Sequence, residues 1–195
     1  MTSVIVYLHG FRSSPASAKA ARLRAFVDAM PESERPLLHI PALTDRPAVA
    51  IAGVADWVRQ HAAGAPLAFI GSSLGGYYAT ALAERFGARA VMINPAIHPY
   101  DTLQPWSGVQ TNLYTGEAFE VTPAHFAELR ALAVPHITRP ERYFLLVETG
   151  DDVLDYREAV AFYGGAYQYV RGGGDHTFTE FATQLRAIVR FALAS

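Results

Sequence analysis

The sequence predicts an α/β protein in which one parallel sheet of six strands is covered by helices on both faces. Six short apolar runs, typical of strands buried on both sides, alternate with segments whose apolar residues recur at helical spacing. This alternation indicates a parallel, doubly wound sheet. In addition, polar clusters follow several of the runs, at the strand ends where such sheets bind ligands. The six predicted strands are 4–8, 37–40, 67–70, 90–93, 143–147 and 166–170.

The helices are predicted from their periodicity and their capping residues. Ser14 before Pro15 indicates the start of the first helix. Gly87 is expected to end the third helix in the left-handed conformation. The last helix is expected to begin at a capping box formed by Thr177 and Glu180. Further helices are predicted at 48–62, 76–86, 123–133 and 156–163.

The composition favours a single domain over residues 1–195. Apolar residues make up 51% of the chain and charged residues 17%, which is typical of a globular protein with a large core. Proline-rich residues 96–141 interrupt the strand–helix rhythm, and we interpret them as a small cap insertion. The net charge of −2 gives no reason to expect nucleic acid or a membrane as a partner.

Cysteine usage and hydropathy exclude several kinds of chemistry. The chain has no cysteine, so thiolate catalysis, disulfides and cysteine-ligated metals are excluded. Nothing at the N-terminus resembles a signal peptide, and no apolar run is long enough to form a transmembrane helix. We therefore expect a cytoplasmic protein.

The strand–turn–helix segment at 67–86 carries the main chemical signal. Ser73 is the centre of the motif G-S-S-L-G at 71–75, between an apolar strand and an alanine-rich helix. The pattern G-x-S-x-G in this context is typical of a nucleophile elbow, in which glycines relieve collisions around a strained serine. The N–H of Leu74, at the start of the helix, is then a candidate oxyanion donor. Ser72 lacks the flanking glycines and is the weaker candidate nucleophile.

A phosphate-binding loop is the alternative interpretation of a glycine-rich turn between a strand and a helix. A P-loop requires G-x-x-x-x-G-K-[ST], and a dinucleotide site requires G-x-G-x-x-G. In this chain Tyr77 and Tyr78 occupy the positions of the P-loop Lys and Ser/Thr. The sequence therefore favours nucleophilic catalysis over phosphate binding.

A serine hydroxyl needs a base to become nucleophilic at neutral pH. After a nucleophile elbow the partners follow in the order acid, then histidine. Of the seven histidines, only His176 follows a strand-end acid that itself comes after Ser73. The acid is Asp151, Asp152 or Asp155. Asp151 is nearest the strand end, whereas the other two are suited to cap the next helix.

The loop after the first strand is expected to supply the second oxyanion donor, the N–H of Phe11. In that loop His9 is better suited to shaping the chain than to acting as a base. We expect the chemistry to need no metal and no organic cofactor. The further candidates for substrate contact are His9, Gly10, Arg12, Tyr77 and Asn94.

Motifs spread over the whole chain resemble those of the YqiA-type esterases, a small branch of the α/β-hydrolase superfamily. The resemblance implies a three-layer α/β-hydrolase fold and a carboxylic-ester hydrolase with Ser73, Asp151 and His176 as its triad. Arg12 stands where the family commonly has Asn, beside the oxyanion loop, where a different side chain bears on acyl or leaving-group preference. The matching segments are Y-L-H-G-F-R-S-S-P at 7–15, G-S-S-L-G-G-Y-Y-A-T at 71–80, N-P-A at 94–96, Y-T-G at 114–116, T-G-D-D-V-L-D-Y at 149–156 and G-G-D-H-T-F at 173–178.

The sequence thus predicts a serine esterase that hydrolyses small-molecule esters through an acyl-enzyme. Thioesters, including acyl-CoA, are equally accessible to this chemistry. One alternative is a hydrolase-fold binding protein that does not turn over substrate, against which the intact Ser–His–acid set argues. The other is a small serine peptidase, for which the cap offers no visible peptide-specificity pocket.

Overall fold

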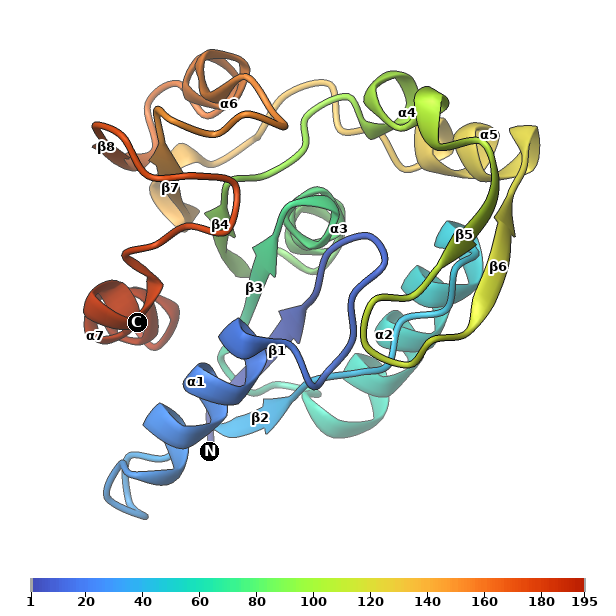
Figure 1. Ribbon diagram of the computed structural model, residues 1–195. Helices are drawn as coiled ribbons and strands as arrows, with labels where there is room; N and C mark the ends of the chain where they lie inside the picture. The colour runs from blue at the N-terminus through green and yellow to red at the C-terminus, as the bar shows by residue number, and fades with distance from the viewer. Residues whose placement is uncertain (1, 195) are drawn as a thin grey trace.

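The computed structural model describes residues 2–194 and contains a six-stranded parallel sheet (Figure 1). The strand order is β2-β1-β3-β4-β7-β8. The chain turns back between β1 and β3, so a topological switch point lies between these strands, where α/β sheets bind ligands. The predicted fold class is confirmed, and each expected strand occurs with bounds shifted by at most two residues. The strands are β1 (Val4–Leu8), β2 (Leu37–His39), β3 (Leu67–Ser72), β4 (Arg89–Ile93), β7 (Tyr143–Glu148) and β8 (Tyr167–Arg171).

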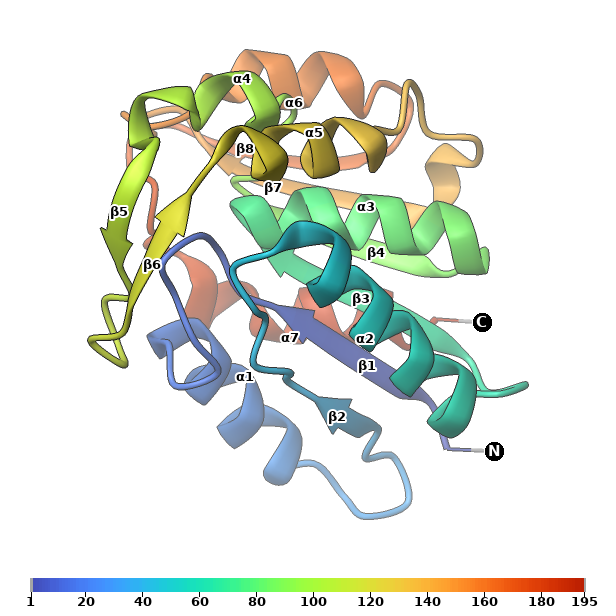
Figure 2. The same cartoon turned by 90° about the vertical axis from the view of Figure 1, so that its right-hand side faces the viewer.

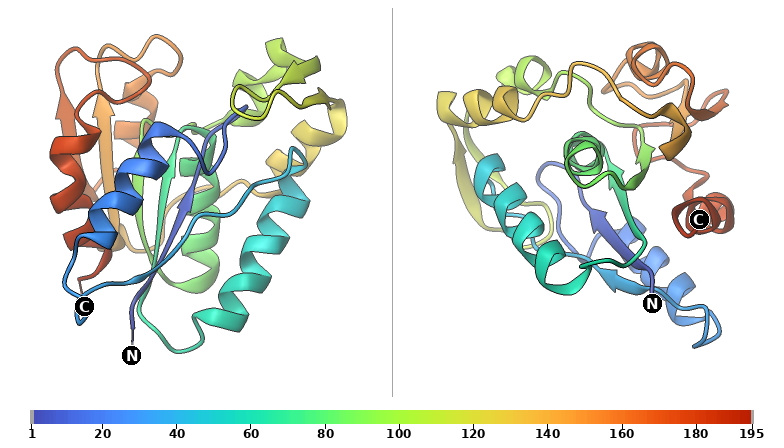
Figure 3. Two further views of the ribbon diagram at one scale, coloured as in Figure 1. Left: turned by 60° about the horizontal axis from the view of Figure 1, so that its bottom comes forward. Right: turned by 180° about the vertical axis from the view of Figure 1, so that it is seen from behind.

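Helices cover both faces of the sheet (Figure 3). They pack on it to form two separate apolar cores. Alternate residues of a strand point to opposite faces, so in β1 Ile5 and Tyr7 join one core while Val6 and Leu8 join the other. The Ile5 face is covered by α1 (Ala18–Asp28) and α7 (Phe181–Ala192), which lie side by side. The Val6 face is covered by α2 (Pro47–His61), α3 (Leu74–Phe86), α5 (Pro123–Ala131) and α6 (Tyr156–Phe162).

The start of α1 differs from the prediction. The helix begins after Ser17 and not at Pro15. Ser14 instead accepts the N–H of Ala16 on its hydroxyl and the N–H of Ser17 on its carbonyl, which closes a turn before the helix. The predicted left-handed C-cap is confirmed at Gly87, where φ is 63°.

The start of α7 is also wrong in the prediction, because no Thr177–Glu180 capping box forms. Thr177 donates its N–H and its hydroxyl to the carboxylate of Asp175, within a turn that precedes the helix. Phe178 has a φ of 59°, which an α-helix excludes. The buried carboxylate of Glu148, at the end of β7, accepts a hydrogen bond from the N–H of Glu180, and the helix begins at Phe181.

Residues 94–142, between β4 and β7, include a hairpin that was not predicted. Figure 2 shows β5 (Gly108–Thr111) and β6 (Ala118–Val121) beside the loop that follows β1. Both strands are short and only Val121 is buried, so they lack the apolar run that identifies a buried strand. The segment also contains the predicted helix α5, a single turn α4 (Pro99–Thr102) and the 3-10 turns η1 (Gln104–Trp106) and η2 (Pro140–Arg142).

Within residues 2–194, every helix is too short or too polar to cross a lipid bilayer.

Candidate active site

Ser73 lies in the turn between β3 and α3 with a strained backbone. Its φ of 56° and ψ of −123° are unfavourable for a residue with a side chain. Two main-chain contacts hold this conformation: the Ser73 N–H donates to Ile93 at 3.0 Å, and its carbonyl accepts the N–H of Ala96 at 3.1 Å. The turn is therefore fixed to the end of the neighbouring strand β4.

The flanking glycines are required by close backbone approach. A Cβ on Gly71 would lie 2.0 Å from the carbonyl oxygen of Gly75, and one on Gly75 would lie 2.0 Å from that of Leu8. A Cβ on Gly76 would lie 2.7 Å from the Cβ of Pro95. The prediction that side chains at positions 71 and 75 would collide is confirmed, and the atoms they would meet belong to the backbone of Gly75 and Leu8.

Three side chains from separate loops meet in one hydrogen-bonded chain. His176 Nε2 lies 3.1 Å from Ser73 Oγ, and His176 Nδ1 lies 2.8 Å from Asp151 Oδ2. A carboxylate can only accept a hydrogen bond, so the His176 nitrogen that faces Asp151, Nδ1, carries the proton. The other nitrogen, Nε2, then presents its lone pair to the serine hydroxyl. The arrangement suits proton transfer from Ser73 to His176.

Of the three candidate acids, Asp151 alone contacts His176. Its side chain is 2% exposed, and Oδ1 accepts the N–H groups of Val153 and Leu154, each at 2.9 Å. Asp155 caps α6 by accepting the N–H of Arg157, in agreement with the sequence argument. Asp152 is exposed and makes no such cap.

Two main-chain N–H groups beside Ser73 have no acceptor within residues 2–194: those of Phe11 and Leu74. Leu74 is the first residue of α3, where the helix dipole places positive charge. The Phe11 loop is close to the serine, since a Cβ on Gly10 would lie 3.3 Å from the Ser73 Cβ. Both donors are thus available for an oxyanion formed at Ser73.

His9 holds the Phe11 loop in place. The His9 Nδ1 lies 3.1 Å from the carbonyl oxygen of the next residue, Gly10. The His9 Nε2 accepts a hydrogen bond from the N–H of Leu43 at 3.3 Å. Burial lowers the pKa of the His9 imidazole, which keeps the ring neutral. Both ring nitrogens are used within the protein, so this side chain shapes the loop.

Arg12 links the same loop to the β5–β6 hairpin. Its Nε donates to the carbonyl of Thr111 at 2.9 Å, and its guanidinium lies 5.3 Å from the centre of the Trp106 ring. Its own carbonyl accepts the N–H of Leu113 at 2.9 Å. Arg12 itself has a φ of 57°, a strained conformation that these contacts stabilise.

Two cavities meet at the loop that contains Gly10 and Phe11. The first, about 570 Å³, is lined by Leu74, Tyr78 and Phe119, and we refer to it as the Phe119 cavity. The second, about 460 Å³, is lined by Ser73, His176 and Lys19, and we refer to it as the Lys19 cavity. Both volumes are within the range of small-molecule sites. Across residues 2–194 no cluster of three or more His, Asp or Glu side chains is arranged to hold a metal ion.

Two candidates for substrate contact lie elsewhere. Tyr77 is buried and donates its hydroxyl to the carbonyl of Leu129 at 2.6 Å, whereas the next residue, Tyr78, lines the Phe119 cavity. Asn94 is also buried and acts as a clamp: its Nδ2 donates to the carbonyl of His176 at 3.2 Å, and its Oδ1 accepts the N–H of Glu148 at 3.0 Å. Asn94 therefore joins β7 to the His176 loop and lines neither cavity.

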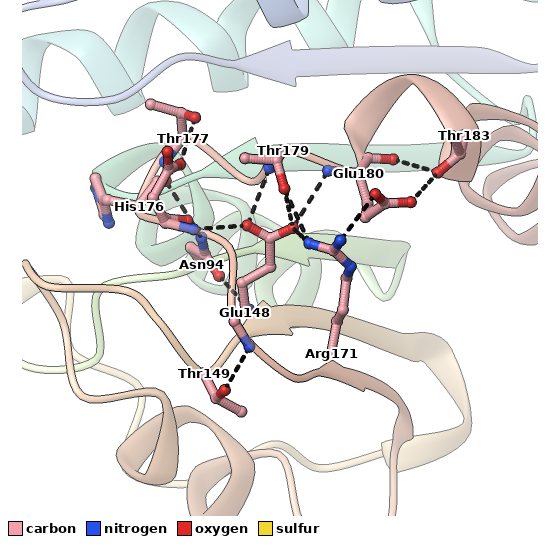
Figure 4. Close-up of polar contacts among 11 residues, drawn as sticks. Asn94, Glu148, Thr149, Arg171, His176, Thr177, Thr179, Glu180 and Thr183 are labelled. Atoms are coloured by element: carbon pink, nitrogen blue, oxygen red, sulfur yellow. Dashed lines mark hydrogen bonds and ion pairs between the residues drawn. The ribbon is translucent and has the colours of Figure 1, made fainter.

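Glu148, the last residue of β7, was not predicted to take part in the site. Its side chain is fully buried, and Figure 4 shows it at the centre of the contacts that hold the His176 loop. Oε1 accepts from Arg171 at 2.9 Å and from the Thr179 hydroxyl at 2.7 Å, and Oε2 accepts the N–H of Asp175 at 2.9 Å and that of Thr179 at 3.0 Å. An acidic residue ending an apolar strand was the only available signal.

Glycines allow this carboxylate to reach the loop. A Cβ on Gly174 would lie 1.9 Å from Glu148 Oε2, and one on Gly150 would lie 2.4 Å from the Gly174 carbonyl oxygen. Gly174 also has a φ of 74°, which favours glycine. The loop preceding His176 is therefore packed directly against the buried charge.

Residues 4–193 match the model of an uncharacterised protein family, UPF0227. The chain belongs to this family. The match spans both strand-end loops that carry Ser73 and His176, and it confirms the resemblance to the YqiA-like proteins.

Solved structures with the same fold are α/β hydrolases, although their sequences are distant from this UPF0227 member. A protein from Agrobacterium vitis S4 has a TM-score of 0.77 at 17% identity, over 99% of this chain and 88% of that one. Mouse alpha/beta hydrolase domain-containing protein 10 has a TM-score of 0.72 at 16% identity, over 97% and 89%. Est1E from Butyrivibrio proteoclasticus has a TM-score of 0.70 at 14% identity, over 98% and 87%. These similarities establish the fold.

Proposed function

We propose that this protein is a serine hydrolase that cleaves carboxylic esters through an acyl-enzyme intermediate. The observation that carries the proposal is the hydrogen-bonded chain from Asp151 through His176 to Ser73, with distances of 2.8 and 3.1 Å, at a strained strand–helix turn. Among the proteins of similar fold, Est1E has been solved with bound ferulic acid, and another is a monoacylglycerol lipase from Paleococcus ferrophilus. Both proteins favour ester chemistry for this chain.

In the first half-reaction Ser73 Oγ attacks the ester carbonyl while its proton passes to His176 Nε2. Asp151 accepts the Nδ1–H throughout and stabilises the imidazolium that forms. The oxyanion of the tetrahedral intermediate is bound by the N–H groups of Phe11 and Leu74. The proton on Nε2 is then donated to the leaving oxygen or sulfur, and the alcohol or thiol departs from the acyl-enzyme.

In the second half-reaction a water molecule replaces the leaving group. His176 Nε2 takes a proton from the water, whose oxygen attacks the acyl carbonyl bound to Ser73 Oγ. Collapse of the second tetrahedral intermediate breaks the acyl–Oγ bond, and His176 returns its proton to the serine. The products are a carboxylic acid and the free enzyme.

We assign the acyl chain of the substrate to the Phe119 cavity. Its apolar lining comes from Phe11, Leu43, Leu74, Tyr78 and Phe119. The β5–β6 hairpin, which contributes Phe119, belongs to the segment that we propose as the cap over residues 96–141. Phe11 packs edge-on against Phe119 with ring centres 5.8 Å apart, so the cap and the oxyanion loop form one apolar wall. This wall favours short and medium acyl chains, of oxygen esters or of thioesters.

Kinetics on matched serine variants test the proposal. The substrates are p-nitrophenyl esters of graded chain length, acyl-CoA thioesters and a peptide p-nitroanilide, which separate the esterase from the thioesterase and peptidase alternatives. Ser73→Ala should abolish hydrolysis without unfolding the protein, and the neighbouring control Ser72→Ala should retain activity. No hydrolysis of any ester or thioester by the wild type would favour the alternative of a binding protein. Normal turnover by Ser73→Ala would refute the assignment of the nucleophile.

A further inference from the structure

The hydroxyl of Tyr78 makes no hydrogen bond within residues 2–194, although its side chain is almost completely buried. Tyr78 is 3% exposed and lines the Phe119 cavity. In the described chain, Ser17 Oγ is the only side-chain oxygen or nitrogen that is both fully enclosed and without a partner. The Tyr78 hydroxyl also lacks a partner, so it is not fully enclosed and has surface open to the cavity that Tyr78 lines.

Tyr78 is the exception among the tyrosines of its core. A buried tyrosine usually finds a partner for its hydroxyl, because an unpaired buried hydroxyl is unfavourable. Within residues 2–194 this core holds three further buried tyrosines, each with its hydroxyl bonded to another residue, and none of the three lines the Phe119 cavity. The hydroxyl without a partner is thus the one that faces the candidate acyl site. The bonded pairs are Tyr77–Leu129, Tyr143–Glu84 and Tyr163–Thr80.

The position of Tyr78 on α3 places it along the path of an acyl chain attached to Ser73. Leu74, whose N–H is a candidate oxyanion donor, lies one helical turn before Tyr78, and both side chains line the Phe119 cavity. Four residues of a helix span about 6 Å along its axis. An acyl chain that enters the cavity past Leu74 therefore reaches Tyr78 a few carbons from the ester.

The Tyr78 hydroxyl is suited to donate a hydrogen bond. Burial raises its pKa, and the nearby carboxylate of Glu128 acts in the same direction, so the hydroxyl keeps its proton. Glu128 is not its acceptor, because that carboxylate is bonded to the Arg46 side chain and to the N–H of Ala48. The proton of Tyr78 is thus available to a ligand.

The charges around the cavity favour a neutral acceptor. The carboxylates of Asp45 and Glu117 line the Phe119 cavity and would repel an anionic group on the acyl chain. The cation that lines it, Arg12, already donates to the carbonyl of Thr111. A hydroxyl or carbonyl oxygen can accept a hydrogen bond from Tyr78 without adding a negative charge.

We propose that the acyl group of the substrate carries a neutral oxygen, a hydroxyl or a carbonyl, which accepts a hydrogen bond from the Tyr78 hydroxyl. The inference rests on the proposed esterase function and specifies the class of acyl group. An oxygenated acyl group pairs the hydroxyl, whereas a plain hydrocarbon chain leaves it unpaired. Tyr78 is therefore a specificity-determining residue, because a site built to hydrogen-bond its substrate discriminates against an analogue that lacks the partner atom.

The test uses two pairs of p-nitrophenyl esters that differ only by an oxygen on the acyl group. One pair is the 5-oxohexanoate and the hexanoate, and the other is the 3-(4-hydroxyphenyl)propanoate and the 3-phenylpropanoate. The measured quantity is the ratio of kcat/KM for the oxygenated ester to that for its parent. Because the intrinsic reactivity of each ester is the same for every enzyme variant, a change in this ratio between variants reports the contact with the oxygen.

Tyr78→Phe removes only the hydroxyl and should lower the ratio by about three- to tenfold in at least one pair, since one hydrogen bond between neutral groups is lost. The pair with the larger loss distinguishes a carbonyl from a hydroxyl as the preferred group. The matched control is Tyr77→Phe, which removes the hydroxyl of the neighbouring tyrosine outside the cavity and should leave both ratios unchanged.

Thermal melts without substrate give a second measurement that does not depend on activity. Tyr77→Phe should lower the melting temperature by about 2–4 °C, because the Leu129 carbonyl loses its donor. Tyr78→Phe should not lower it, because no hydrogen bond within the protein is lost. An equal fall in both variants would overturn the inference, since the Tyr78 hydroxyl would then be stabilising the fold.

Failure of the inference is distinguishable from failure of the proposed function. Ratios that are the same in wild type, Tyr78→Phe and Tyr77→Phe would overturn the inference, while Ser73-dependent hydrolysis of the hexanoate would leave the proposed function standing. Equal losses of the ratio in the two tyrosine variants would also overturn it, because they would indicate a general disturbance of α3. Hydrolysis of the hexanoate by Ser73→Ala would instead refute the proposed function, and the inference with it.

Discussion

Replacing Glu148 with glutamine tests whether the buried carboxylate holds the His176 loop. The change is nearly isosteric, but it removes the charge and converts one oxygen into an NH₂ group. In the wild type, the N–H groups of Asp175 and Thr179 lie 2.9 and 3.0 Å from Glu148 Oε2. If the NH₂ group takes the place of Oε2, these two donors face another donor. Turning the amide over brings the NH₂ group against Arg171 and the N–H of Glu180 instead. Neither orientation satisfies all the donors.

The cost of the substitution follows from the hydrogen bonds that glutamine cannot accept and from the loss of the buried negative charge that pairs with Arg171. Each hydrogen bond to a charged group contributes about 1.5–3 kcal/mol, and breaking a buried ion pair by removing one partner costs about 3–5 kcal/mol. We therefore expect Glu148→Gln to lower the free energy of unfolding by about 3–5 kcal/mol. For a protein of this size the melting temperature should fall by roughly 6–20 °C.

Urea and thermal unfolding of the two proteins measure this difference. Glu180→Gln is the matched control: Glu180 also pairs with Arg171, at 3.2 Å, but is partly exposed, so its loss should cost less than about 1 kcal/mol. A loss below about 1 kcal/mol in Glu148→Gln, or equal losses in the two variants, would refute the reasoning.

The same carboxylate predicts a pH dependence of stability. Burial alone would raise the pKa of Glu148, but the hydrogen bonds from Thr179, Asp175 and Glu180 outweigh it and hold the pKa below its usual value of 4.5. A carboxyl whose pKa is lowered by folding stabilises the protein fully above its unfolded-state pKa. The stability difference between wild type and Glu148→Gln should be constant from pH 6 to 8 in urea titrations, and it should shrink as the pH falls below about 4.5. A difference that does not change down to pH 3 would contradict this.

Three further outcomes are expected. Asp151→Asn should cut kcat by about 10⁴, as in serine triads, whereas the exposed Asp152→Asn should change kcat little and stability by less than about 0.5 kcal/mol; the reverse pattern would make Asp152 the acid. Gly75→Ala should abolish folding or lower the free energy of unfolding by more than about 3 kcal/mol in chemical denaturation, because its Cβ would lie 2.0 Å from the Leu8 carbonyl oxygen. A near-normal melting temperature would show that the turn relaxes. For p-nitrophenyl esters, kcat/KM should rise by up to roughly fourfold per methylene until the Phe119 cavity is filled and then fall, and a continued rise to C16 would contradict the assigned cavity.

The parts of the fold that the sequence predicted are those encoded locally. The buried strands are continuous apolar runs, and the turn at Ser73 is specified by glycines within three residues of it. The strand-end positions of Asp151 and His176 then followed from the parallel topology, which brings these loops to one edge of the sheet.

The parts that were missed depend on contacts between distant segments. The acceptor role of Glu148 requires the loop around Asp175 and Thr179 to fold back on the end of β7. Tyr77 and Tyr78 are adjacent in the sequence, and only the packing of α5 against α3 decides that Tyr78 faces the cavity. The strained backbone of Arg12 likewise depends on the β5–β6 hairpin, whose short exposed strands leave no apolar pattern.

Covalent labelling with a fluorophosphonate tests the central proposal, a nucleophilic Ser73 activated by His176, most directly. Intact-mass and peptide measurements should find one adduct per chain on the peptide that contains residues 71–75, with fragment ions assigning it to Ser73. Ser73→Ala should take up no label, Ser72→Ala should label normally, and His176→Ala should label far more slowly because the hydroxyl has no base. A wild-type protein that hydrolyses esters but stays unlabelled, or carries the adduct on Ser72, would contradict the account.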